Sequence, residues 1–126
     1  MDIFFADPSE VPLPPAEVRI QVLKIEPWPD GQRVRVYIEI DPFQKRPSAE
    51  LEVKNQAGQT VASVSVIETM DRRMEFNLHL REKESGGTYQ ISAVLYYSES
   101  EESEGDEVPP QKITEVDRKL TTFEIA

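Results

Sequence analysis

Three segments of the chain alternate apolar and polar residues with a period of two, the pattern of a β-strand that buries one face. They are RVRVYIEI at 33–40, RMEFNLHLR at 73–81 and TYQISAVLYY at 88–97. No window of helical length shows a convincing 3.6-residue period, so strands are expected to build the core. The inward residues are predicted to be Val34, Val36, Ile38, Ile40, Met74, Phe76, Leu78, Leu80, Tyr89, Ile91, Ala93, Leu95 and Tyr97.

Weaker segments supply four further strands, at 18–25, 49–54, 60–67 and 119–126. In the first of these the apolar residues change phase between Val22 and Leu23, which predicts a β-bulge or a strand that crosses between sheets. A helical turn at 113–120 is an alternative for the segment before the last strand. Seven short strands in 126 residues predict one all-β domain at 18–126, a two-sheet antiparallel β-sandwich.

The segment GTYQISAVLYY at 87–97 resembles the penultimate strand of immunoglobulin-like and fibronectin type III-like domains, where a glycine-containing turn precedes a tyrosine and alternating apolar residues. The resemblance implies that Tyr89 occupies the tyrosine corner, with its hydroxyl bonded back to the preceding loop. The Cys…Trp…Cys framework of true immunoglobulin domains is missing, because the chain has no cysteine and Trp28 precedes the second strand. The resemblance implies a fold and no particular function, since this architecture serves many roles.

Residues 1–17 differ from the rest of the chain because four prolines favour an extended, polyproline-like backbone. This segment nevertheless carries three large apolar residues, Ile3, Phe4 and Phe5. One interpretation is that they cover part of their own sandwich. The other is that they dock on a second copy or on a partner by adding a strand to an exposed sheet edge. The segment, or an edge strand, is therefore a candidate contact in a homodimer.

The net charge of −10 arises largely from one run, SESEESEGDEVPP at 98–110, which contains six acidic residues and no basic one. Outside this run, 18 acidic residues stand against 14 basic ones. Such a balance gives no general attraction to nucleic-acid phosphates or to an anionic membrane, so we expect neither as a partner. The lack of a long apolar span and of a basic, apolar leader favours a cytoplasmic location.

The acidic run falls in a long loop expected at 98–112, and strand alternation brings that loop to the same end as loops 41–48 and 68–72. In one interpretation the opposite charges at this end only offset one another, and each exposed pair contributes about 0–1 kcal/mol. In the other, the loops recognise a basic or mixed-charge protein partner, with Phe43 as an apolar anchor. The other candidate residues are Lys45, Arg46, Arg72, Arg73, Glu101, Glu102, Glu104 and Asp106.

Catalytic chemistry has little support in this sequence. The only histidine, His79, is expected on the outward row of its strand, and the chain lacks both cysteine and a glycine-rich phosphate loop. We therefore expect a non-catalytic protein without a cofactor. The sequence predicts a protein-interaction or structural β-sandwich module whose partner is another protein or a second copy of the chain.

An accessory ligand-binding domain of a larger assembly is the alternative function. Asp41, Asp71 and Asp106 would pool carboxylate oxygens, which Ca²⁺ prefers, although basic neighbours in the same loops would repel the ion. Carbohydrate is the second ligand class, because exposed aromatic rings commonly form platforms for sugars. The aromatic candidates for such a platform are Trp28, Tyr37 and Tyr96.

Overall fold

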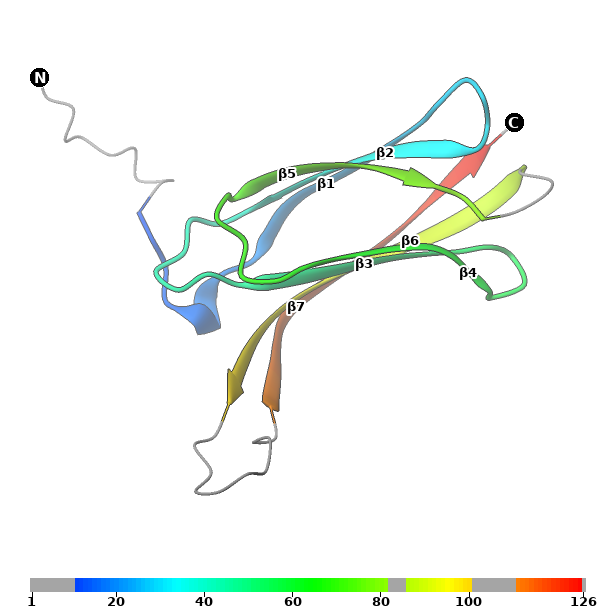
Figure 1. The fold of residues 1–126 in the computed structure, drawn as a ribbon. Coiled ribbons are helices and arrows are strands. Elements are labelled where there is room, and N and C mark those ends of the chain that lie inside the picture. The colour runs from blue at the N-terminus through cyan, green and yellow to red at the C-terminus, as the bar shows by residue number, and fades with distance from the viewer. Residues whose placement is uncertain (1–10, 82–85, 101–110, 126) are drawn as a thin grey trace, which may run out of the picture.

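Two antiparallel β-sheets pack face to face in this protein (Figure 1). The computed structural model describes residues 11–81, 86–100 and 111–125, and no helix within these ranges has the length and apolar character needed to cross a membrane. One sheet has the strand order β1-β2-β5 and the other the order β4-β3-β6-β7. This arrangement confirms the predicted all-β sandwich. The elements are the 3₁₀ turn η2 (Pro15–Glu17) and the strands β1 (Ile20–Pro27), β2 (Arg33–Ile40), β3 (Ser48–Lys54), β4 (Thr60–Val66), β5 (Arg73–His79), β6 (Gly87–Ser100) and β7 (Gln111–Ile125).

The core lies between the two sheets and is built from the alternating segments. In β2, Val34 and Val36 are fully buried, whereas Arg35 between them is exposed on the opposite face. β6 repeats this pattern from the other sheet, with Ile91 and Leu95 fully buried. Burial of an apolar side chain of this size contributes about 1.5–3 kcal/mol. The period of two therefore explains both why these segments are strands and why the sheets pack together.

The fourth strand joins the second sheet because a tight turn folds it back on β3. In that turn the Asn55 side-chain oxygen accepts hydrogen bonds from the backbone N–H groups of Ala57 (3.0 Å) and Gln59 (2.9 Å). Gly58 has a φ of +80°, a left-handed conformation that glycine adopts at little cost. β4 therefore pairs with β3, whereas the corresponding strand of immunoglobulin constant domains lies in the sheet of the first, second and fifth strands.

The first strand contains the predicted irregularity. The register of β1 with β2 shifts between Ile20 and Val22, which confirms the bulge expected from the phase change of the apolar residues. At this point the Ile20 N–H donates a hydrogen bond of 2.8 Å to the Asp117 carboxylate in β7. The start of β1 thus contacts the opposite sheet as well as its own sheet, and the hydrogen bond to Asp117 joins the two sheets.

Tyr89 closes the other end of the sandwich. Its side chain is 1% exposed and stacks on Phe123 of β7, with ring centroids 5.5 Å apart. The Tyr89 hydroxyl accepts a hydrogen bond of 3.2 Å from the N–H of Gly86, a residue of the preceding loop. This is the bond back to the loop that the tyrosine-corner resemblance implied.

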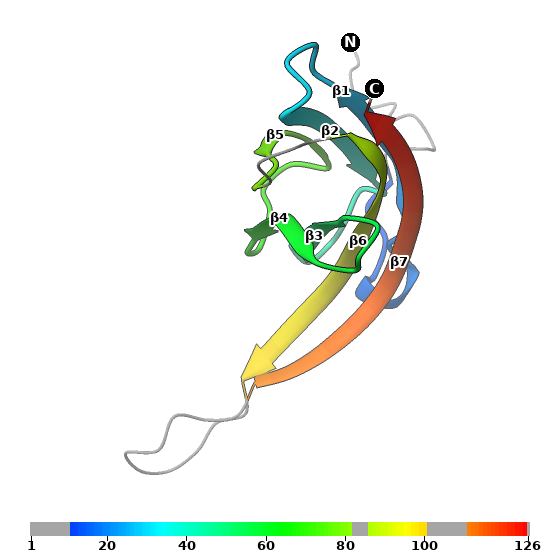
Figure 2. The same cartoon turned by 90° about the vertical axis from the view of Figure 1, so that its right-hand side faces the viewer.

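The last two strands are much longer than the others and extend beyond the sandwich as a two-stranded ribbon (Figures 1 and 2). β6 pairs with β7 as far as Ser100↔Gln111, whereas its pairing with β3 ends at Tyr96↔Ser48. A helical turn at 113–120 is therefore wrong, because cross-strand pairing with β6 holds this segment extended. The loop expected at 98–112 is therefore shorter than predicted, because residues 98–100 belong to β6 and residues 111–112 belong to β7.

Candidate functional site

The base of the ribbon meets two loops of the sandwich. The Tyr97 hydroxyl of β6 donates a hydrogen bond of 2.9 Å to the carbonyl of Lys45, in the connection between β2 and β3. The connection between β4 and β5 joins the same region, because the Thr69 N–H donates to the carbonyl of Pro47 (2.8 Å). The structure thus brings loops 41–48 and 68–72 together beside β6, as strand alternation predicted.

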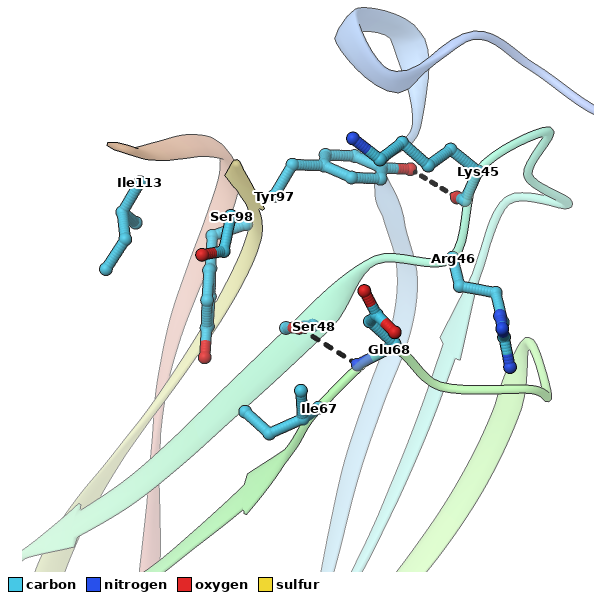
Figure 3. Close-up of a pocket in the computed structure, with 9 residues that line it drawn as sticks. Lys45, Arg46, Ser48, Ile67, Glu68, Tyr97, Ser98 and Ile113 are labelled. Carbon is cyan, nitrogen blue, oxygen red and sulfur yellow. Dashed lines mark hydrogen bonds between the residues drawn. The ribbon is translucent and has the colours of Figure 1, made fainter. Parts of the chain in front are cut away.

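A groove of about 200 Å³ lies where the ribbon leaves these loops (Figure 3). We call it the ribbon-base groove. β6 and β7 form one wall, and the two loops with the start of β3 form the other. Its lining residues are Lys45, Arg46, Ser48, Ile67, Glu68, Tyr96, Tyr97, Ser98 and Ile113.

Large apolar side chains around the groove remain exposed to solvent. Ile67 is 68% exposed and Ile113 is 63% exposed, and both line the groove. Met70 in the adjoining loop is 78% exposed. Single exposed apolar residues are ordinary on protein surfaces, but a group of them beside a concavity is typical of an interaction site.

The backbone at Glu68 is strained, and the strained turn lies between two of these exposed apolar residues, Ile67 and Met70. Glu68 has a φ of +47°, a left-handed conformation that is uncommon for residues other than glycine. Its N–H donates to the Ser48 hydroxyl at 3.0 Å (Figure 3). The next N–H, of Thr69, donates to the Pro47 carbonyl. These bonds hold the turn between the exposed Ile67 and Met70. Strained residues of this kind cluster at functional sites, so Glu68 supports the assignment of a site here.

Basic side chains also line the groove, and they stand on the same wall as Ile67 and Glu68, whereas Ile113 stands on the β7 wall (Figure 3). Lys45 and Arg46 are both exposed, and the Lys45 ammonium lies 5.8 Å from the centroid of the Tyr97 ring. Burial raises the pKa of the Tyr97 hydroxyl, which therefore stays protonated and donates to the Lys45 carbonyl at neutral pH. The groove accordingly offers exposed apolar side chains, two basic side chains and the Glu68 carboxylate.

The remaining predicted candidates do not line the groove. Phe43 is half-buried and forms a parallel bridge with Leu13, so the chain's own segment 11–14 covers the expected apolar anchor. Arg72 is half-buried behind the groove, and Arg73 pairs with Glu39 across the β2–β5 ladder at 2.6 Å. Glu101, Glu102, Glu104, Asp106, Ile3, Phe4 and Phe5 lie outside the described residues.

The position of the ribbon changes what is expected of the acidic run. Ser100 and Gln111, which flank residues 101–110, are the last pair of the ribbon, and Figures 1 and 2 both show this pair well away from loops 41–48 and 68–72. Compensation of Lys45 and Arg46 by the acidic run stays a prediction. However, Ser100 and Gln111, between which the run is attached, lie away from the basic residues whose charge it was expected to offset.

The Arg73–Glu39 pair gives a pH-dependent prediction. The hydrogen bond from Arg73 lowers the pKa of Glu39, with a smaller lowering from Tyr37. A depressed folded-state pKa means that the pair stabilises the fold above the unfolded pKa of the glutamate and loses this effect as pH falls through the folded value. We expect Arg73→Gln to raise the Glu39 pKa toward its ordinary value in an NMR titration of the carboxyl carbons.

Asp30 provides the internal control for this titration. Its pKa is lowered by hydrogen bonds from the Gln32 backbone and the Arg33 side chain, which Arg73 does not contact. Its titration should be the same in wild type and Arg73→Gln. An unchanged Glu39 curve in the variant would show that Arg73 does not set this pKa.

Two residues considered for carbohydrate or calcium binding, Trp28 and Asp41, form contacts with neighbouring residues of the fold. One face of the Trp28 ring is covered by the Arg33 guanidinium, 4.3 Å from its centroid, and the indole N–H donates to Asn77. Asp41 accepts hydrogen bonds from the backbone of Arg19 and the side chain of Gln21. Within 11–81, 86–100 and 111–125, no three acidic or histidine residues form a group suited to a metal ion. His79 is exposed, as expected for the outward row of β5.

Comparison with protein-family models and with curated proteins gave no match. The interpretation of the ribbon-base groove therefore depends on its own geometry. Two of the lining residues carried a signal in the sequence that did not lead to this groove. Tyr96 was predicted to point outward from its strand and was considered only for carbohydrate binding, and Ile113 was placed at the start of a possible helical turn.

Proposed function

We propose that the protein is a non-catalytic interaction module that binds a segment of another protein in the ribbon-base groove. The observation that carries this proposal is the exposure of Ile67 and Ile113 in a groove that Lys45 and Arg46 also line. Apolar contacts at the centre of an interface supply most of its free energy, and peripheral charges supply orientation and association rate. A groove with both features suits a segment that carries large apolar side chains together with carboxylates.

Selection from a random peptide library displayed on phage tests this function without a known partner. We expect the selected peptides to combine aromatic or aliphatic residues with Asp or Glu. Ile113→Asp should weaken their binding by about tenfold or more in calorimetric titration, because it places a charge among the exposed apolar side chains of the groove.

Leu120→Asp is the matched control. Leu120 lies on the same strand as Ile113 and is similarly exposed, at 56%, but it does not line the groove. Its substitution should leave peptide affinity unchanged. Failure of any peptide to be selected, or equal losses in the two variants, would overturn the proposed function.

A further inference from the structure

The groove contains an open strand edge. β6 pairs with β3 from Gln90 to Tyr96, but no strand of the described chain pairs with its next four residues, Tyr97–Ser100, on that side. Pro47, which precedes β3, is fully buried, and its carbonyl accepts the Thr69 N–H of the β4–β5 connection instead of pairing with β6. The chain before Ser48 turns away from β6 toward β2. This turn leaves a space beside β6, in the position that a longer β3 would occupy.

An extended segment fits this position as an added strand. Alternate residues of a strand turn their N–H and C=O groups to the same side, so Tyr97–Ser100 present a short row of groups to the groove. A strand added there would continue the ladder that β3 begins at Ser48↔Tyr96. Alternate side chains of the new strand would point outward toward Tyr96, Ile67 and Ile113. Backbone pairing would supply affinity and these pockets would supply specificity.

The chain itself contains a segment with the required chemistry. Residues 2–7 read DIFFAD, in which three large apolar residues, Ile3, Phe4 and Phe5, lie between Asp2 and Asp7. Apolar residues match the exposed apolar side chains of the groove, and the flanking carboxylates match Lys45 and Arg46. Residues 1–10 lie outside the described part of the chain, so this match comes from their sequence and from the groove.

The described structure anchors the start of this segment close to the groove. The Gln44 N–H donates to the carbonyl of Leu13 (3.0 Å), and the Gln44 side chain donates to the carbonyl of Pro12 (3.3 Å). Gln44 directly precedes Lys45, a residue of the groove wall. The five residue steps from Pro12 back to Asp7 reach about 17 Å when extended. A short tether of this kind corresponds to an effective concentration of about millimolar, which favours docking within one chain over docking between chains.

We propose that residues 2–7 occupy the ribbon-base groove of their own chain as an added strand beside Tyr97–Ser100. The segment then acts as an internal competitor that a partner must displace. This inference rests on the proposed function, because it assigns an occupant to the same groove. It also favours one of the two interpretations of Ile3, Phe4 and Phe5, namely cover of their own sandwich.

The test compares the full chain with the triple variant Ile3→Ser, Phe4→Ser, Phe5→Ser by NMR. In the variant we expect shifted methyl signals for Ile67 and Ile113 and amide exchange at Tyr97–Ser100 about tenfold faster or more. The Leu120 methyl serves as the internal control and should not shift. A single cooperative unfolding transition and unchanged methyl signals from the core of the sandwich would show that the variant remains folded. Unchanged Ile67 and Ile113 signals would overturn the proposal.

Two further measurements separate this proposal from its alternatives. Sedimentation velocity should give a monomer at low and at high protein concentration. A dimer that disappears in the triple variant would show that the segment docks on a second copy of the chain, and this result would overturn docking within one chain. Peptides selected from the library should bind the triple variant more tightly than the wild type, because the competitor is gone. Equal affinities would refute the internal competitor while leaving the proposed function intact.

Discussion

Replacement of Tyr89 by alanine should lower the free energy of unfolding by about 3–5 kcal/mol, the largest loss that we expect from a single substitution. Tyr89 is 1% exposed and stacks on Phe123, its cross-strand neighbour, so its removal leaves a cavity in the core between the two sheets and exposes the partner ring. Domains of this size are stable by only about 5–15 kcal/mol. The variant should therefore unfold at a much lower urea concentration than the wild type.

Tyr89→Phe separates the ring from the hydroxyl. It keeps the stack on Phe123 and removes the hydroxyl that accepts the Gly86 N–H bond, a loss of about 0.5–1.5 kcal/mol. Urea unfolding followed by far-ultraviolet circular dichroism measures both variants. If Tyr89→Phe were as destabilising as Tyr89→Ala, the hydroxyl rather than the ring would be the main contributor, contrary to our interpretation.

Asp117→Ala should produce the second-largest loss, about 1–3 kcal/mol. The Asp117 carboxylate accepts the hydrogen bond from Ile20, and Ile20 is 3% exposed. Without the carboxylate, this N–H remains buried at the bulge of β1, where the shifted register interrupts the ladder with β2. The effect should appear as a lower urea midpoint and as faster amide exchange at Ile20.

Two variants on the same strand control for this result. Asp117→Asn keeps an acceptor oxygen and should lose less than Asp117→Ala. Glu124→Ala removes an exposed carboxylate and should change stability by no more than about 0.5 kcal/mol. A loss in Glu124→Ala equal to that in Asp117→Ala would show that net charge, and not the bond to Ile20, is responsible.

The sandwich was predictable because its determinants are local. A period of two in 33–40 places Val34, Val36, Ile38 and Ile40 on one face whatever the neighbouring strands are, and burial of that face follows from the hydrophobic effect. The phase change between Val22 and Leu23 likewise marked the irregularity of β1 that the register shift between Ile20 and Val22 confirms.

The ribbon was not predictable in the same way. Residues 113–120 have no clean alternation, since the pairing with β6 carries its own register shift at Leu95/Tyr96 and moves Ile113 and Leu120 to the exposed face. The strand state of this segment depends on the partner strand beside it, and β-propensity read from one segment does not contain that partner. The same limit explains why the sequence of this segment is also compatible with a helical turn.

By itself, the sequence determined the fold class and the core faces of the main strands, because each follows from residue type and period along a single segment. Only the tertiary structure decided that β3 begins at Ser48 while β6 continues past its partner Tyr96 to Ser100, and that Ile67, Ile113, Lys45 and Arg46 line the resulting groove. The physical reason is that a groove is made by the unequal lengths and positions of several strands. Those quantities arise from long-range pairing, and no single segment of the sequence contains them.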